Sequence, residues 1–361
     1  MKSFVLKAVY ATAAIAWLFS AANAGTLIAV PSVPGSTATV VRGINDNNVI
    51  TGTYTDPDGS VHGFVGTLDG NYTGFDFPYG DTIPEAINND GYITGLSNYT
   101  TNDCPYYGCE YLRGPDGLIT AITKDGAPLD GVAQGIIGNT KFVGQYAVFN
   151  GVLSIYGYYG QGTQYRAGLT LPFNANRVSP RGYNKKRMVT GYFVDLDHGS
   201  LRTGFVLKRG TATAVNYPDA NAFYTFLESV NDKGLIAGAW SNQDGSVEQP
   251  FIFNFANNAF SLISVPDAPI AFANAINNKG VVAVTDFTSS YIYCMKKKEC
   301  PASPRAIEIP DRWIPAKTRS VICRNGCTGP LRIPSNHGKI DAAAIREAIG
   351  HDPEFGPIGR R

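Results

Sequence analysis

Polar residues that could take part in binding or catalysis recur at regular intervals in this 361-residue chain. They lie three positions before a recurring turn, which is usually at asparagine: Arg42, Glu85, Gln134, Arg181, Glu228, Asn274 and Arg319. The next position is always small, and the one after it is apolar or tyrosine. We call these positions the polar, small and apolar columns. A polar column in an otherwise buried strand needs hydrogen-bond partners.

Two interpretations of the polar column compete. In the structural one, which we favour, Arg42 pairs with Glu85 and Arg181 with Glu228 around a ring of repeats. In the functional one, the column is a ligand site at the mouth of a central channel, and Arg319 forms a basic notch for an anion beside Arg42. A carboxylate pair such as Glu85 and Glu228 could act as acid and base, but no pattern argues for it.

For the other candidate sites we prefer a structural role to a binding role. The Asp-rich turns at 56–59, 195–199 and 242–245 could bind calcium, but they lack the distal carboxylate of a calcium loop. We therefore expect ordinary hairpin turns, with no metal and no cofactor. A tyrosine cluster could stack on sugars, but alternating tyrosines are also common in strands; it comprises Tyr156, Tyr158, Tyr159 and Tyr165.

Catalytic signatures are missing from the sequence. It contains no G-x-S-x-G elbow, no H-E-x-x-H helix and no phosphate-binding loop. The four histidines share no position in the repeat. We therefore favour a noncatalytic protein.

The element that must position the polar column is a repeat through most of the chain. Its copies include GINDNNVITG (43–52), AINNDGYITG (86–95), SVNDKGLIAG (229–238) and AINNKGVVAV (275–284). The copies, including three weaker ones, end at residues 52, 95, 144, 191, 238, 284 and 329. A period near 46 residues is typical of a propeller or another repeat architecture.

Each copy reads as four short strands. In the first, they are predicted at 37–45, 49–55, 61–68 and 72–78, separated by turn residues. Four antiparallel strands per repeat predict an all-β fold, a β-propeller over residues 25–333. We favour seven blades, the last tentatively after residue 310, over six blades with an appendage. The strand at 26–31 is expected to complete the last blade and close the ring.

The first copy resembles the HAF-type probable extracellular repeat. The residues that carry the resemblance are Ile44-Asn45-Asp46, Gly52, Tyr54 and Val61-His62-Gly63-Phe64. Later copies keep the first half of the pattern and lose the histidine, and the resemblance weakens after Cys294. It implies secretion and a propeller-like fold, and it implies no particular reaction.

The N-terminus has the design of a secretory signal peptide. Lys2 and Lys7 precede an apolar run at 8–19, and Ala22-Asn23-Ala24 forms a cleavage site, so residues 1–24 are expected to be removed. We expect a secreted or periplasmic protein without a membrane span. Such a compartment would oxidise three local cysteine pairs, namely Cys104 with Cys109, Cys294 with Cys300, and Cys323 with Cys327.

Charge separates the chain into two parts. Residues 25–290 carry 15 Lys and Arg against 22 Asp and Glu, whereas residues 291–361 carry 13 against 7. A near-neutral total argues against nucleic-acid binding. A tail at 334–361 is expected to contain one short helix, near 341–349.

These observations predict a secreted or periplasmic propeller that acts as a noncatalytic binding or scaffold module. Its partner would be a small molecule, a glycan or a protein, and we expect a monomer. The alternative is a glycan-directed hydrolase or lyase with its site at the channel mouth. A structural surface protein is a third class.

Overall fold

The computed structural model describes residues 8–9, 25–78, 80–98, 102–296, 298 and 300, and all statements on structure concern these residues. They form β-strands, turns and one short 3-10 turn, η1 (Gly138–Thr140), without an α-helix. No helix in this part of the chain has the length and hydropathy that a membrane crossing requires. The predicted seventh copy with Arg319, the Cys323/Cys327 pair and the helix near 341–349 lie outside the described residues.

Successive stretches of the chain each form a unit of four antiparallel strands. The first unit contains β3 (Ala38–Ile44), β4 (Val49–Thr55), β5 (Val61–Thr67) and β6 (Tyr72–Phe75). The second contains β7 (Thr82–Ile87), β8 (Ile93–Ser97), β9 (Cys109–Arg113) and β10 (Ile119–Ala121). The third contains β13 (Gly131–Ile137), β14 (Lys141–Phe149), β15 (Leu153–Gln161) and β16 (Gln164–Leu169).

The later units follow the same order. The fourth contains β17 (Ala175–Tyr183), β18 (Met188–Asp195), β19 (Leu201–Lys208) and β20 (Thr211–Val215). The fifth contains β21 (Tyr224–Val230), β22 (Leu235–Ser241), β23 (Glu248–Asn254) and β24 (Ala259–Leu262). The last contains β25 (Phe272–Ile276), β26 (Val281–Thr285), β27 (Ser290–Cys294) and, from the other end of the chain, β2 (Thr26–Ala29).

The third and fourth units belong to one eleven-stranded sheet. A single parallel bridge, Ile155 to Arg177, joins β15 to β17. Three two-residue strands extend this sheet at its edges, namely β1 (Ala8–Val9), β11 (Thr123–Lys124) and β12 (Ala127–Pro128).

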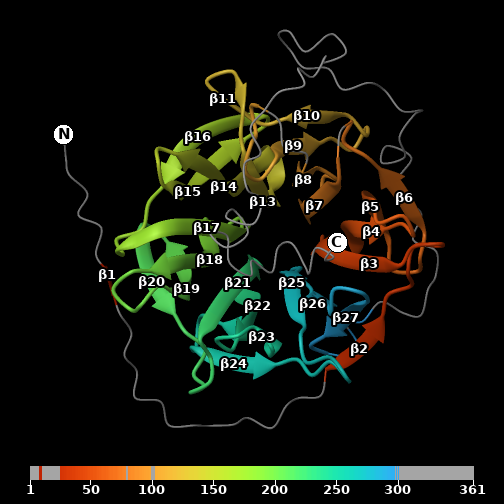
Figure 1. The fold of residues 1–361 in the computed structure, drawn as a ribbon. Coiled ribbons are helices and arrows are strands. Elements are labelled where there is room, and N and C mark those ends of the chain that lie inside the picture. The colour runs from red at the N-terminus through yellow and green to blue at the C-terminus, as the bar shows by residue number, and fades with distance from the viewer. Residues whose placement is uncertain are drawn as a thin grey trace. The chain divides into compact units, whose positions relative to one another are not determined.

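The units stand around a common centre in a propeller-like arrangement (Figure 1). The first strand of each unit lies innermost and the fourth lies outermost. Apolar side chains fill the space between neighbouring sheets; Leu227, Ile236 and Phe251 of the fifth unit pack with Val206 of the fourth, for example. The predicted all-β class and the four-strand repeat are therefore confirmed.

The N-terminal strand completes a unit, but a different one from that predicted. It was expected to join a unit formed after residue 310, yet β2 pairs with β27 from Thr26↔Cys294 to Ala29↔Tyr291. The reason is that the last described unit already contacts the first. The Ser290 hydroxyl accepts from the amide of Val41 (2.8 Å) and donates to the carbonyl of Thr39 (2.9 Å).

The turn between the first two strands of a unit explains part of the glycine content. Its fourth residue has a positive φ in five units, at Gly91, Gly234, Gly280, Asn48 and Arg187. Glycine adopts this left-handed region without steric cost, and asparagine tolerates it better than most residues. The repeated turn therefore selects glycine at three of these positions.

Candidate functional site

The polar column occupies a β-bulge on the first strand of each unit. The pairing register shifts at this point in all described copies, at Arg42, Glu85, Gln134, Arg181, Glu228 and Asn274. A bulge leaves one residue without a partner on the neighbouring strand and re-aims its side chain. The sequence located the column, but it did not predict the bulge.

Neighbouring units pair through this column. The Arg42 guanidinium donates to Oε1 of Glu85 at 3.1 Å, and Nε of Arg181 lies 3.7 Å from Oε2 of Glu228. The Asn274 amide donates to the carbonyl of Val41 at 2.9 Å. The pairs proposed in the structural interpretation are therefore present, and each glutamate faces a cationic partner on the adjacent unit.

The small column is where the inner strands approach most closely. A Cβ atom on Gly182 would lie 2.9 Å from Cα of Ser229, and one on Gly135 would lie 3.0 Å from Cα of Gly182. The corresponding distance from Gly43 to Cα of Ala86 is 3.1 Å. Side chains larger than those of the small column would push these strands apart.

The turn asparagines form a layer that sequence reasoning missed. Each side-chain oxygen accepts two amides of its own turn; Oδ1 of Asn231, for example, accepts from Lys233 (3.0 Å) and Leu235 (3.1 Å). Each side-chain nitrogen donates to the backbone of the next unit, at distances of 2.8–3.1 Å. We call this set the Asn layer: Asn45, Asn88, Asn184, Asn231 and Asn277.

The third unit interrupts the Asn layer. Ile137 stands at the asparagine position, and its carbonyl accepts from Asn88 at 3.1 Å. Its own side chain cannot donate onward to the fourth unit. The turn that follows is η1, in which Asn139 and Thr140 both have positive φ. The signal was visible in the sequence, because this copy lacks the asparagine.

The residues after the Asn layer form a polar rim. Asp46 accepts from the side chain of Asn89 (2.7 Å) and from the backbone and side chain of Asn278 (2.8 and 3.0 Å). Asp232 accepts from the backbone amide of Lys185 (2.9 Å) and the side chain of Asn278 (2.9 Å). Burial raises the pKa of Asp46, but these hydrogen bonds outweigh it and lower the pKa overall.

A cavity of about 160 Å³ lies inside this rim, and we call it the cup. It is lined by residues of the small column, the apolar column, the Asn layer and the rim. The carboxylate of Asp90 and the ammonium of Lys185 belong to exposed residues that flank the interruption in the third unit. None of the described polar-column residues lines the cup.

The tyrosine cluster is largely packing. Tyr158 is fully buried and bonds to the carboxyl of Glu110, whereas Tyr156 is 47% exposed. Burial raises the pKa of Glu110 well above its usual value. The ammonium of Lys124 lies 4.7 Å from the ring centroids of both Tyr146 and Tyr165.

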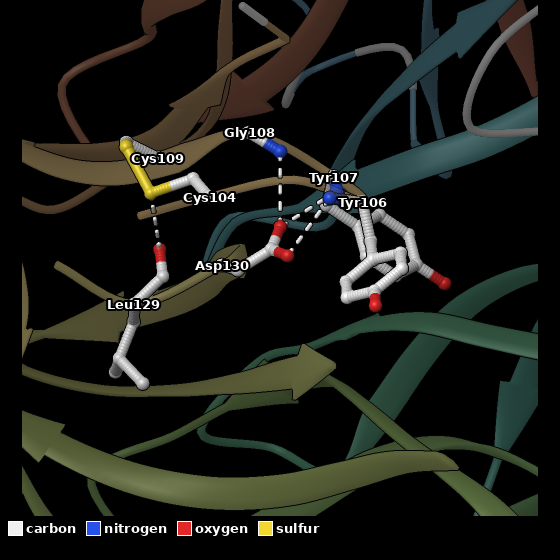
Figure 2. The surroundings of a disulfide bond; sticks show 7 residues. All are labelled: Cys104, Tyr106, Tyr107, Gly108, Cys109, Leu129 and Asp130. Carbon is white, nitrogen blue, oxygen red and sulfur yellow. Dashed lines mark hydrogen bonds between the residues drawn. A yellow bond between two sulfur atoms is a disulfide. The ribbon is translucent and has the colours of Figure 1, made fainter. Parts of the chain in front are cut away.

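A disulfide and a carboxylate hold one loop in the second unit (Figure 2). Cys104 and Cys109 are bonded, and three amides between them bind Asp130: Tyr106 (2.8 Å), Tyr107 (2.6 Å) and Gly108 (3.1 Å). Burial raises the pKa of Asp130, although these amides oppose the shift. The predicted Cys294–Cys300 disulfide is also present.

Two of the Asp-rich turns use a carboxylate to bind the serine that follows the turn glycine. Asp58 accepts from the amide of Ser60 (2.9 Å), and Asp244 accepts from the amide and hydroxyl of Ser246 (3.0 and 2.7 Å). Within the described ranges, no group of three or more His, Cys, Asp or Glu side chains is placed to hold a metal ion.

One buried carboxyl has an unusual pKa. Burial is the main reason that the pKa of Glu248 rises to about 7, and Glu228 raises it further. Ser241 and Arg202 act in the opposite direction. The Arg202 guanidinium lies 5.3 Å from the ring centroid of Tyr224.

Comparison with known proteins gives no family. No family model and no curated protein matches the chain. Solved structures with a similar arrangement include a streptogramin B lyase, at 12% identity and a TM-score of 0.43, covering 74% of this chain and 97% of that one. A mutant Aleuria aurantia lectin in complex with Fucalpha1-6GlcNAc has 12% identity and a TM-score of 0.40, covering 73% and 94%.

A third structure is a polysaccharide lyase, ulvan lyase, at 11% identity and a TM-score of 0.42, covering 72% of this chain and 80% of that one. Likenesses at this level carry no argument about function. The propeller description rests on the strand order and hydrogen bonds of the chain itself.

Proposed function

We propose that this chain is a secreted or periplasmic six-bladed β-propeller that acts as a noncatalytic binding module, with the cup as its ligand site. The cup is the single observation that carries the proposal, because it joins a compact cavity to converging polar groups. The proposed count of six is supported by the contact between the last described unit and the first, in which the side chain of Asn277 donates to the carbonyl of Asn45 at 3.0 Å.

The compartment is inferred from two features. The N-terminal sequence has the order of a signal peptide, and the described part of the chain contains two disulfides. Disulfides persist in oxidising compartments and are rare in the cytosol. Both features support a protein that functions outside the cytoplasm.

The burial and pairing of the glutamates in the polar column support a noncatalytic role. Glu85 and Glu228 each face an arginine, and their side chains are mostly buried. A general acid or base must reach the proton that it transfers. Carboxylates held against guanidinium groups are better suited to joining neighbouring blades.

The cup suits a small polar ligand, such as a metabolite or the terminal sugar of a glycan. Its volume is below that of pockets for drug-sized ligands, which span roughly 300–1,000 Å³. Its rim offers carboxylates, amides and one ammonium group, which can bind hydroxyl or amine groups. Asp90 and Lys185 are the rim charges that a ligand meets with the least rearrangement, because both residues are exposed.

The test is a thermal-shift screen of metabolites and glycans on the chain from residue 25 onward, followed by calorimetry of each hit. Asp90→Asn and Lys185→Met should weaken binding about tenfold, which is ~1.4 kcal/mol. Lys186→Met and Asp125→Asn are matched controls, since both residues are exposed and neither lines the cup. A ligand that binds both rim variants as tightly as it binds the wild type would show that its binding site is not the cup. An empty screen would favour a scaffold.

A second candidate function, a glycan-directed hydrolase or lyase, is favoured by Glu248. A carboxyl with a pKa about 7 beside a second carboxyl, Glu228, is a pattern found at acid–base sites. Release of reducing ends from a polysaccharide panel, lost in Glu248→Gln, would support catalysis. Activity that survives this substitution would exclude Glu248 as the catalytic acid.

A further inference from the structure

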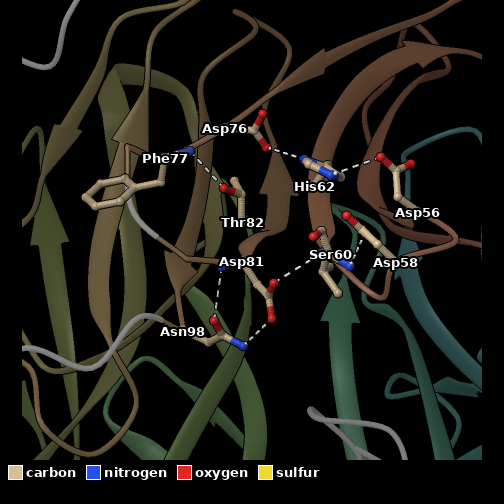
Figure 3. A network of polar contacts seen from close by, with 10 residues as sticks. Asp56, Asp58, Ser60, His62, Asp76, Phe77, Asp81, Thr82 and Asn98 are labelled. Atoms are coloured by element: carbon tan, nitrogen blue, oxygen red, sulfur yellow. Dashed lines mark hydrogen bonds and ion pairs between the residues drawn. The ribbon is translucent and has the colours of Figure 1, made fainter. Parts of the chain in front are cut away.

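His62 on β5 lies between two aspartates (Figure 3). Its Nδ1 atom is 2.8 Å from Oδ1 of Asp76, and its Nε2 atom is 3.3 Å from Oδ2 of Asp56. The imidazole also stacks on Tyr54, with ring centroids 5.0 Å apart and planes at 24°. The proposed function does not involve this cluster.

The two partners of His62 set its protonation. A neutral imidazole has one N–H donor and one acceptor nitrogen, whereas ionised carboxylates only accept. Nδ1 shares a hydrogen bond with Asp76, whereas the contact from Nε2 to Asp56 is an ion pair without a hydrogen bond. Only the imidazolium carries the positive charge that attracts both aspartates. Burial lowers the pKa of His62, but Asp76, Asp56 and Asp58 together raise it above its ordinary value. Tyr54, the other titratable group at the ring, has a raised pKa and stays neutral.

The cluster joins two connections at the end of β4 that is remote from the Asn layer. Asp56 begins the β4–β5 turn, and Asp76 follows β6 in the β6–β7 connection. Farther along that connection, Asp81 accepts from the amide of Val61 (3.1 Å) and from the side chain of Asn98 (2.7 Å). These contacts tie the first unit to the second (Figure 3).

We propose that His62, Asp56 and Asp76 form a pH-sensitive latch that holds the β4–β5 turn to the β6–β7 connection while the imidazole is protonated. A histidine whose pKa is raised on folding contributes stability below its unfolded pKa, about 6.5. That stability is lost as the pH rises through the folded pKa. The neutral ring then keeps its hydrogen bond to Asp76 and loses the charge that attracts Asp56.

The first test is an NMR titration of the imidazole C–H signals, with hydrogen exchange of backbone amides measured between pH 5.5 and 8.5. His62 should titrate above about 6.5. Exchange at residues 56–61 and 76–82, corrected for its intrinsic pH dependence, should rise several-fold across that midpoint. His198→Gln is the matched control, because His198 lies in the fourth unit, outside the latch, and also contacts a carboxylate, that of Asp195, at 2.9 Å.

Two variants complete the test. His62→Gln should abolish the extra exchange at high pH, and Asp76→Asn should shift the His62 midpoint downward while keeping the ring. The Asp76→Asn variant still tests the latch if His62→Gln does not fold. A midpoint at or below about 6.5, or the same pH-dependent exchange in His62→Gln, would overturn the latch.

Discussion

The Asn layer and the polar column lie three positions apart on the same inner strands, yet they behave differently. In the Asn layer, one residue type repeats and makes the same contacts in five units. In the polar column, the residue type varies, and the contacts change from a salt bridge at Arg42 to a side-chain-to-backbone bond at Asn274. A contact that carries the ring geometry tolerates little variation, whereas a bulged position accommodates several kinds of pair.

The largest effect is expected from Asn231→Ala in the Asn layer. This change removes two hydrogen bonds within the turn and one to Asn277, and it leaves a buried carbonyl and two partly buried amides without these partners. We expect a loss of about 3 kcal/mol in the free energy of unfolding, measured by urea denaturation. Asn47→Ala is the control, because Asn47 is an exposed residue of an equivalent turn. Equal losses of unfolding free energy in both variants would show that the Asn layer matters no more to stability than other residues of the turn.

A smaller loss is expected from Arg181→Met in the polar column. Glu228 would lose its nearby guanidinium, and Tyr192 would lose both a hydrogen bond (3.3 Å) and a cation–π contact (5.3 Å). Removing one partner of a buried pair is costly, and we expect a loss of about 2 kcal/mol. The double variant with Glu228→Gln should recover part of it. If the double variant recovers none of the lost unfolding free energy, Arg181 and Glu228 are not energetically coupled.

Glu248→Gln should change how stability depends on pH. The raised pKa, about 7, means that wild-type stability is highest below the usual glutamate range and falls as the pH rises through 7. The variant should lack this fall, so that its stability relative to that of the wild type rises by about 2 kcal/mol between pH 5 and pH 8. Urea denaturation at both values measures it. Parallel stability curves would show that Glu248 ionises at its ordinary pKa.

The smallest effect is expected from Ile137→Asn, which restores the missing member of the Asn layer. An added hydrogen bond to the fourth unit should stabilise the chain by about 0.5 kcal/mol. Differential scanning calorimetry should show a rise in Tm of roughly 1–2 °C. A fall in Tm would mean that the backbone of η1 is incompatible with the asparagine turn. The third unit would then differ from the others in its whole turn and not only in the residue at position 137.

Sequence reasoning predicted the strand repeat closely because the turn residues and the alternation of side chains are local properties. The predicted second strand, 49–55, matches β4, and the predicted third, 61–68, exceeds β5 by one residue. The pairing of Arg42 with Glu85 could be predicted because the repeat period places them on neighbouring units.

The cup and the partner of the N-terminal strand could not be predicted in this way. Whether β2 joins β27 or a later strand depends on which edge is free once the ring has closed, and spacing does not encode that. The Asn layer was visible as a turn signal, but its donation to the next unit depends on how the sheets are placed. The hydrogen bond from Asn231 to Asn277 is one example.

The junction of β2 with the last unit has a consequence for how the chain folds. Next to this junction the last unit also bonds to the first, through Val41 and Ser290, which are 249 positions apart in the sequence. Contacts between such distant residues form slowly because a long loop must first be closed. β2 can therefore form its pairs only after the strand ending at Cys294 has been synthesised. We therefore expect the pairing of β2 with β27 to be among the later steps of folding.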